Sequence, residues 1–276
     1  MKIVYFGSDV FLDVFRYLLE RHEILALYTY HKGEDYFNEE NIVHLARLHE
    51  IPVHYTQISE EEMVERIERD GCNLFFVAEY SHKLALPNNP GFRGVNIHSS
   101  LLPEGRSYYP IECAMDREYA ESGVTIHKLA SHLDCGDILA QRCYTIEPKD
   151  DSIDLYLKSA QGALEMVKEV MEDFEWSWQN AKPQPKTLSY WYRPQPEDMT
   201  IRHEMTVEEA QVVYRKFNKM TMVDISGQRY FVDSFAMGNF YLGTDDQDVI
   251  YVRHDRVLYG VADGHVRLDL RVVPTE

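Results

Sequence analysis

The stretch Lys2-Ile3-Val4-Tyr5-Phe6-Gly7-Ser8-Asp9 decides the fold. Its β-branched and aromatic residues favour a strand, and the glycine that follows them favours a turn. Apolar residues then recur at helical spacing, namely Val10, Phe11, Val14, Phe15, Leu18 and Leu19. The order predicts a strand, a glycine turn and a helix.

The same alternation continues along the chain. Apolar runs predict strands over 23–30, 51–54 and 73–78, and helical spacing predicts helices over 39–50 and 59–69. Strands that alternate with helices are typical of an α/β fold, a Rossmann-like and mostly parallel sheet with helices on both faces. Ligands of such sheets bind at the carboxyl ends of the strands.

The rest of the chain predicts the remaining elements of this unit and then a second, smaller unit. Strands are expected over 95–98, 123–129 and 138–146, and a long amphipathic helix from 152 to about 174. A polar connection bearing prolines follows, and then one helix over 207–217 and short β segments broken by Gly227, Gly238, Gly243 and Gly264. We expect one domain over 1–178, a linker over 179–196 and a small β-rich C-terminal domain over 197–276.

Composition excludes several classes of protein. A formal net charge of -18 disfavours bulk binding of nucleic acid, although a local cationic patch would still hold one small anion. Asp9 interrupts any signal peptide, and no apolar run reaches the ~18 residues of a membrane span, so we expect a cytoplasmic protein without a membrane partner. No C-x-x-C pair occurs among the four cysteines, so we expect reduced thiols and no metal: Cys72, Cys113, Cys135 and Cys143.

Two segments carry residues suited to chemistry. In Val95-Asn96-Ile97-His98-Ser99-Ser100-Leu101-Leu102-Pro103, Asn96 and His98 face the same side of a strand that ends in a polar loop. An amide donor beside an imidazole suits an oxyanion and a proton transfer, although such a pair also ties down loops. In His132-Leu133-Asp134-Cys135-Gly136-Asp137, Asp134 is placed to orient a histidine, although taken alone the segment reads as a turn.

Together the two segments resemble the signature of the formyltransferase family that uses 10-formyltetrahydrofolate. That signature is an Asn-x-His-x-Ser-Leu-Leu-Pro run followed by Gly-Val-Thr-Ile-His and Asp-x-Gly-Asp-Ile-Leu segments, and both halves are present. The resemblance covers the first two thirds of the chain and implies a catalytic triad of Asn96, His98 and Asp134. Asn96 and His98 would stabilise the oxygen that gains charge, and Asp134 would support the imidazole and a proton relay. His127 is expected to be a structural neighbour.

The resemblance also implies a cofactor slot for 10-formyltetrahydrofolate, as a co-substrate. One wall would hold the pterin ring largely through main-chain groups of Tyr80, Ser81, His82, Lys83 and Leu84. The other wall would be Leu129, Ala130, Ser131, His132 and Leu133. Plain core packing is the alternative for Leu84 and Leu86.

The sequence departs from the family after Leu-Leu-Pro, where Arg106 is present and the glycine that usually follows it is not. Since this loop borders the acceptor side in the family, the departure leaves the acceptor open. Arg106 would contact a phosphate or be a solvated loop residue. We expect substrate contacts from Arg106, Tyr108, Tyr190, Trp191, Tyr192 and Arg193, although the aromatic cluster would also serve as a hydrophobic plug.

Charge favours one branch of the family. From Tyr190 to Glu276 ten Lys or Arg stand against fourteen Asp or Glu, a net charge of -4, whereas gripping tRNA needs several cationic phosphate contacts. We therefore expect formyl transfer to the amine of a nucleotide-linked amino sugar. The alternatives are a methionyl-tRNA formyltransferase, a formyltetrahydrofolate hydrolase or a degenerate binding module. By analogy with sugar-modifying members, a homodimer is one expectation.

Overall fold

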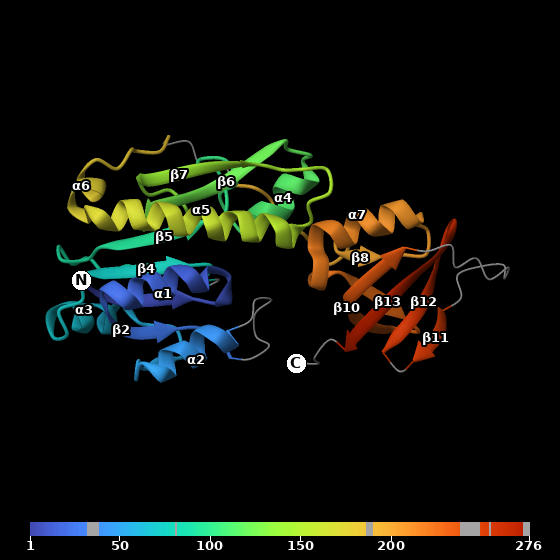
Figure 1. Ribbon diagram of the computed structural model, residues 1–276, viewed down its shortest axis with the longest axis horizontal. Coiled ribbons are helices and arrows are strands. Elements are labelled where there is room, and N and C mark those ends of the chain that lie inside the picture. The colour runs from blue at the N-terminus through green and yellow to red at the C-terminus, as the bar shows by residue number, and fades with distance from the viewer. Residues whose placement is uncertain (32–38, 81, 186–189, 238–248, 254, 273–276) are drawn as a thin grey trace. The chain divides into compact units, whose positions relative to one another are not determined.

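The computed structural model describes residues 1–31, 39–80, 82–185, 190–237, 249–253 and 255–272 (Figure 1). Ser81, Gly238 and Gly243 lie outside these ranges. The chain divides into two compact units: the first comprises 1–114, 118–147 and 155–192, and the second comprises 115–117, 148–154 and 193–276. The domain and linker boundaries expected from the sequence remain a prediction.

The first unit contains a seven-stranded sheet in the order β3-β2-β1-β4-β5-β6-β7. The first five strands of this order, β3, β2, β1, β4 and β5, are parallel to one another. Strand β6 pairs antiparallel with β5, and β7 pairs antiparallel with β6. The mostly parallel sheet expected from the sequence is confirmed. The strands are β1 (Lys2–Gly7), β2 (Glu23–Tyr28), β3 (Val53–His54), β4 (Leu74–Ala78), β5 (Gly94–His98), β6 (Glu121–Lys128) and β7 (Ile138–Thr145).

Helices cover both faces of this sheet, as predicted. On β1, Ile3 and Tyr5 share one core with α1, α2 and α5, while Val4 and Phe6 share another with residues of α3. Because successive side chains of a strand point to opposite faces, alternate residues of β1 lie in two separate cores. Figure 1 shows α1 and α5 on the same side of the sheet. The helices are α1 (Leu12–Arg21), α2 (Glu40–Leu48), α3 (Glu60–Glu68), α4 (Pro110–Asp116), α5 (Ser152–Glu172) and α6 (Phe174–Gln179), preceded by the 3₁₀ turn η1 (Asp9–Phe11).

The ends of α2 and α3 differ from the sequence prediction by one or two residues, and two other helix boundaries differ for an identifiable reason. The first helix opens as the 3₁₀ turn η1 and becomes regular only at Leu12. The long helix predicted to about residue 174 ends at Glu172, because the Asp173 side chain accepts a hydrogen bond from the Trp176 amide and starts α6. The short helix α4 was not predicted, since its pattern is too brief to show a period.

The second unit is built on a six-stranded sheet in the order β11-β12-β13-β10-β9-β8. Its helix α7 (Val207–Phe217) begins with a capping box between Thr206 and Glu209, and Ala210 packs into the core of the sheet. The β-rich C-terminal part predicted from the sequence is confirmed. The remaining elements are β8 (Thr200–Ile201), η2 (Asn218–Met220), β9 (Met222–Ile225), β10 (Gln228–Met237), β11 (Val249–Arg253), β12 (Arg256–Val261) and β13 (Gly264–Val272).

Among the described residues, no helix combines the length and the apolar character that crossing a membrane requires. The four cysteines are free thiols, and burial raises the pKa of Cys72 to about 11. Cys72 therefore behaves as a small apolar side chain of the core at neutral pH.

Candidate active site

The site begins with a pair of residues on adjacent antiparallel strands. The register of β5 and β6 places Asn96 opposite His127, and Asn96 Nδ2 lies 3.1 Å from His127 Nε2. His127 Nδ1 lies 2.8 Å from the carbonyl oxygen of Lys128, which can only accept, so Nδ1 carries the ring proton. The bare Nε2 then accepts from Asn96, and the pair fixes both side chains.

Burial decides the charge of His127. The imidazole is 1% exposed, and desolvation lowers its pKa to about 4 even though the neighbouring Asp134 acts to raise it. A carboxylate beside an imidazole favours the charged ring, but desolvation outweighs that effect at His127. His127 is thus a neutral hydrogen-bond acceptor at physiological pH. It contacts Asn96 and lies 3.6 Å from Asp134.

His98 is held by the loop that follows its own strand. Its Nε2 donates to the carbonyl oxygen of Gly105 over 2.7 Å, and the ring is 8% exposed. Nδ1 faces Asp134 Oδ1 at 3.9 Å, while His127 Nε2 lies 3.6 Å from the same oxygen. The structure therefore brings the three residues predicted for the triad together, with Asp134 between two imidazoles.

The backbone around Asp134 is strained. Asp134 has φ 53°, in the left-handed region, and its Oδ2 accepts a hydrogen bond from the amide of Ser107 over 3.0 Å. Gly136 passes so close to β6 that a Cβ there would lie 1.8 Å from the carbonyl oxygen of Lys128. Glu79, Ser107 and Tyr109, in the neighbouring loops, also have positive φ. Strain concentrated around one carboxylate is typical of a functional site.

Gln184 is the residue that sequence reasoning missed. Its Oε1 accepts from Arg106 Nε and Nη2 over 3.2 and 2.8 Å, and its Nε2 donates to the carbonyl oxygens of Asp134 and Gly136 over 2.9 and 2.8 Å. Arg106 is fully buried, so the expected alternative of a solvated loop residue is wrong. The only signal in the sequence was the polar connection in which Gln184 stands.

The two predicted walls of the cofactor slot lie on one apolar cluster. Leu84 is buried in the core that contains Val4 and Phe6, and Tyr80 and Leu129 pack against that core while remaining partly exposed. The binding of a pterin at these residues remains a prediction. His82, Ala130 and Leu133 are half-buried, and Lys83, Ser131 and His132 are exposed.

The residues expected to contact substrate have different environments. Trp191 is buried beside Cys113 and Ala114, with its ring edge-on to Tyr119. The Tyr190 hydroxyl donates to the carbonyl oxygen of Leu133 over 3.4 Å, close to Asp134 in the chain. Tyr108, Tyr192 and Arg193 are exposed. Their role in substrate binding remains a prediction, as does that of Arg106.

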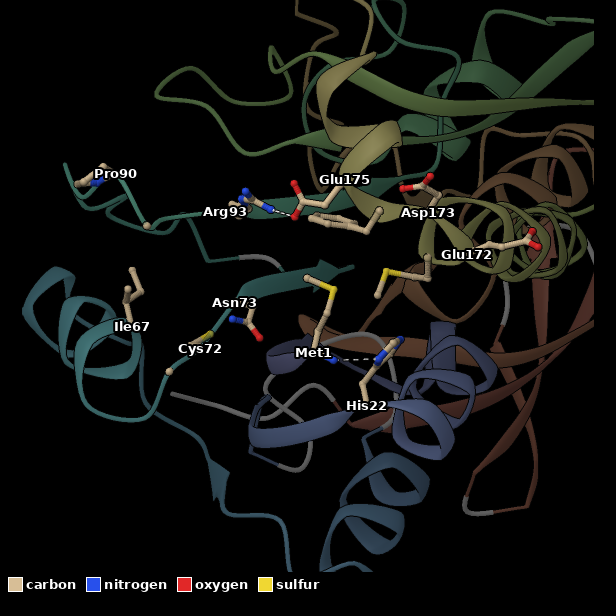
Figure 2. A pocket seen from close by; sticks show the side chains of 14 residues that line it. Met1, His22, Ile67, Cys72, Asn73, Pro90, Arg93, Glu172, Asp173 and Glu175 are labelled. Atoms are coloured by element: carbon tan, nitrogen blue, oxygen red, sulfur yellow. Dashed lines mark hydrogen bonds and ion pairs between the residues drawn. The ribbon is translucent and has the colours of Figure 1, made fainter.

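A cavity of about 680 Å³ lies elsewhere in the first unit (Figure 2). It is lined by Met1, Asn73 and Arg93, which precede or open β1, β4 and β5, and by acidic residues at the start of α6. The cavity therefore sits at the amino ends of the strands, whereas His98 ends its strand on the opposite edge. Ligands of open α/β sheets bind at the carboxyl ends, so size alone does not make this cavity the site. Within the described ranges, no group of three or more His, Cys, Asp or Glu is arranged to hold a metal ion.

Comparison with known proteins shows the family of the chain. The sequence profile of the formyl transferase family matches residues 21–171. A methionyl-tRNA formyltransferase from Acinetobacter baylyi is 30% identical over 230 residues, which cover 77% of this chain and 69% of that protein. One from Sulfurihydrogenibium is 27% identical over 205 residues, covering 70% of this chain and 66% of that protein. The chain therefore belongs to the formyl transferase family, as its motifs predicted.

Solved structures show the same fold. HypX from Aquifex aeolicus, in complex with tetrahydrofolic acid, superposes with a TM-score of 0.73 and 18% identity over 100% of this chain, which spans only 45% of that chain. An N-formyltransferase from Helicobacter canadensis, in complex with folinic acid and dTDP-3-aminofucose, gives a TM-score of 0.61 and 18% identity, covering 98% of this chain and 99% of that chain.

Proposed function

We propose that the protein transfers a formyl group from 10-formyltetrahydrofolate to the amine of a nucleotide-linked amino sugar. The observation that carries the proposal is the cluster in which Asp134 lies 3.9 Å from His98 Nδ1 and 3.6 Å from His127 Nε2, next to the Asn96 amide. A buried carboxylate, two imidazoles and an amide donor are the groups that acyl transfer to an amine requires. The apolar side chains of Tyr80 and Leu129, partly exposed beside the core, support the expected position of the pterin of the donor.

In the reaction, the acceptor amine forms a bond to the formyl carbon, and the bond from that carbon to N10 of the folate breaks. The carbonyl oxygen gains charge in between. Within the part of the chain that the structure describes, Asn96 Nδ2 donates to His127 alone, so its second N–H serves the oxyanion. Because Nε2 of His98 donates to Gly105, its Nδ1 is the atom that moves a proton, with Asp134 Oδ1 facing it. The proton lost by the amine is finally matched by one gained at N10.

Charge in the second unit supports a small acceptor over tRNA. Arg229 forms two hydrogen bonds of 2.9 Å with Asp224, and Arg271 Nε lies 3.1 Å from Asp233 Oδ1. Arg256 is paired with Asp269 in the same sheet. Cations neutralised within the sheet contribute little to a polyanion footprint, which depends on counterion release. A diphosphate needs only one or two cations.

The similar proteins include both a sugar N-formyltransferase and methionyl-tRNA formyltransferases. The Helicobacter canadensis structure contains folinic acid and a dTDP-linked aminofucose, which favours the sugar branch. The Acinetobacter baylyi relative is a methionyl-tRNA formyltransferase, which keeps initiator tRNA as the second candidate. A hydrolase, with water in place of the amine, is the third, and release of formate without any acceptor would reveal it.

The test is calorimetric titration with 5-formyltetrahydrofolate, a stable analogue of the donor, followed by uridine- and thymidine-linked amino sugars. We expect saturable binding of the folate and of one amino-sugar nucleotide in its presence, and formylation of that sugar when 10-formyltetrahydrofolate replaces the analogue. Efficient formylation of methionyl-tRNA without any sugar formylation would refute the acceptor. Failure to bind the folate would refute the proposal as a whole.

A further inference from the structure

The carboxamide of Gln184 joins two loops, one that contacts the Asp134 side chain and one that contains Asp134. One is the loop at 105–107, which supplies the carbonyl that holds His98 and the amide that holds Asp134 Oδ2. The other is the loop at 134–136, whose backbone carbonyls accept from Gln184 Nε2. Arg106, in the first loop, donates to Gln184 Oε1. A single side chain therefore spans both supports of the carboxylate.

The orientation of this amide is fixed by its partners. A guanidinium only donates hydrogen bonds and a carbonyl only accepts them. Reversing the Gln184 amide would place its NH₂ group against the Arg106 guanidinium and its oxygen against the two backbone carbonyls, and neither contact would be a hydrogen bond. The contacts use both protons of Nε2 and both lone pairs of Oε1. The segment itself is anchored by the reciprocal 2.8 Å backbone hydrogen bonds between Lys182 and Ile138, at the start of β7.

We propose that Gln184 is a positioning residue that locks the two loops around Asp134 and so sets the spacing between Asp134, His98 and His127. Its effect on turnover rests on the proposed function, but its effect on the two imidazoles does not. Asp134 has a left-handed backbone, which persists only when the surroundings enforce it, and the hydrogen bond at its own carbonyl supplies that constraint. Displacement of a reacting group by about 1 Å costs up to 10²-fold in rate.

The main variant is Gln184→Met, which keeps the length of the side chain and removes all four hydrogen bonds. We expect kcat for formyl transfer to fall about 10- to 100-fold, with the dissociation constant for 5-formyltetrahydrofolate changed by less than about 3-fold. The matched control is Gln179→Met, an exposed glutamine at the end of α6, which should retain the kinetics of the unchanged protein.

A second variant separates the two halves of the amide. In Gln184→Glu the side chain still accepts from Arg106 but faces the carbonyls of Asp134 and Gly136 without a donor. We expect it to lose activity as Gln184→Met does. Full activity in Gln184→Glu would overturn the proposal, because the donor half would then be dispensable.

Coupling to Asp134 distinguishes positioning from general stabilisation. In an Asp134→Asn background, we expect Gln184→Met to reduce single-turnover formyl transfer by less than about 2-fold, since its effect passes through the missing carboxylate. If Gln184→Met reduced the rate in the Asp134→Asn background by the same factor as in the unchanged protein, the proposal would be overturned.

An experiment without substrate keeps the inference separate from the proposed function. We expect the ¹⁵N resonances of the His98 and His127 rings to shift in Gln184→Met and to stay in place in Gln179→Met, in the full chain without ligand. Unchanged ring resonances in Gln184→Met would overturn the inference whatever the protein formylates. Shifted resonances together with no folate binding would instead refute only the proposed function.

Discussion

Charged side chains in the interior of the first unit differ from those on the sheet of the second unit. The first unit buries Arg106, Glu112, His127 and Asp134 to 6% exposure or less. The second pairs its sheet arginines with aspartates at the surface, as in Arg229 and Asp224, whose side chains are 41% and 48% exposed. Desolvating a charge is costly, whereas a surface pair costs and gains little. The difference is the one expected if the proposed chemistry lies in the first unit, and it shows that these arginines and aspartates of the second unit neutralise one another.

The largest effect should come from the buried carboxylate of the site. Asp134→Asn keeps the shape of the side chain and removes its charge, so we expect kcat for formyl transfer to fall about 10³-fold with the folate still bound. Steady-state kinetics with the amino-sugar acceptor would measure this. Asp224→Asn, its counterpart at the surface of the second unit, should leave kcat unchanged. Equal losses in both variants would break the distinction between the units.

Glu112 provides a test through stability. Burial, reinforced by the nearby Glu79, raises the pKa of Glu112 from 4.5 to about 8, and Tyr156 donates to its carboxyl over 3.2 Å. The folded state keeps the proton that the unfolded state loses above pH 4.5, so this contribution to stability declines as pH rises from 4.5 to 8. Each unit of pKa difference corresponds to about 1.4 kcal/mol.

Glu112→Gln should therefore flatten the fall in unfolding free energy between pH 4.5 and 8, as measured by urea denaturation across that range. At pH 8 the variant should be more stable than the unchanged protein. Glu208→Gln, at an exposed position of α7, is the control from the second unit. If Glu112→Gln kept the full pH dependence, the fall in unfolding free energy would not come from Glu112. The carboxyl of Glu112 in the unchanged protein would then be ionised in the folded state.

The smallest effect is expected for the surface pairs. Arg229→Met removes the two hydrogen bonds to Asp224, and we expect a loss of less than about 1 kcal/mol in unfolding free energy at low salt. The loss should shrink further in 1 M salt, where screening is stronger. A loss several times larger would show that the charges of the second unit are as consequential as the buried ones.

The sequence predicted those parts of the molecule that depend on local pattern. Residues 2–6 were expected to form a strand of a sheet with helices on both faces, and the structure places Ile3 and Tyr5 in one core and Val4 and Phe6 in the other. Asn96 and His98 were expected on one side of a strand end, and the structure places His98 beside Asp134 and joins Asn96 to the same cluster through His127.

Features that depend on distant contacts were not predictable in this way. Gln184 is separated by 78 residues from Arg106 and by 50 from Asp134, and nothing in its neighbours distinguishes it from a solvated glutamine. The burial of Arg106 likewise depends on a segment remote in the chain. The low pKa of His127 follows from complete enclosure, which a sequence does not report.

The antiparallel pairing of β5 with β6 has a consequence for how such a protein diversifies. Asn96 faces His127 because of the ladder between the strands, and the connection from 99 to 120 adds nothing to that register. Residues inserted or deleted after Ser107, beyond the backbone groups of 105–107 that hold His98 and Asp134, would change the loop expected to border an acceptor while Asn96 and His127 keep their pairing. A lineage with this fold could therefore exchange one acceptor for another by rebuilding residues 108–120, provided that the backbone contacts of 105–107 to His98 and Asp134 are kept.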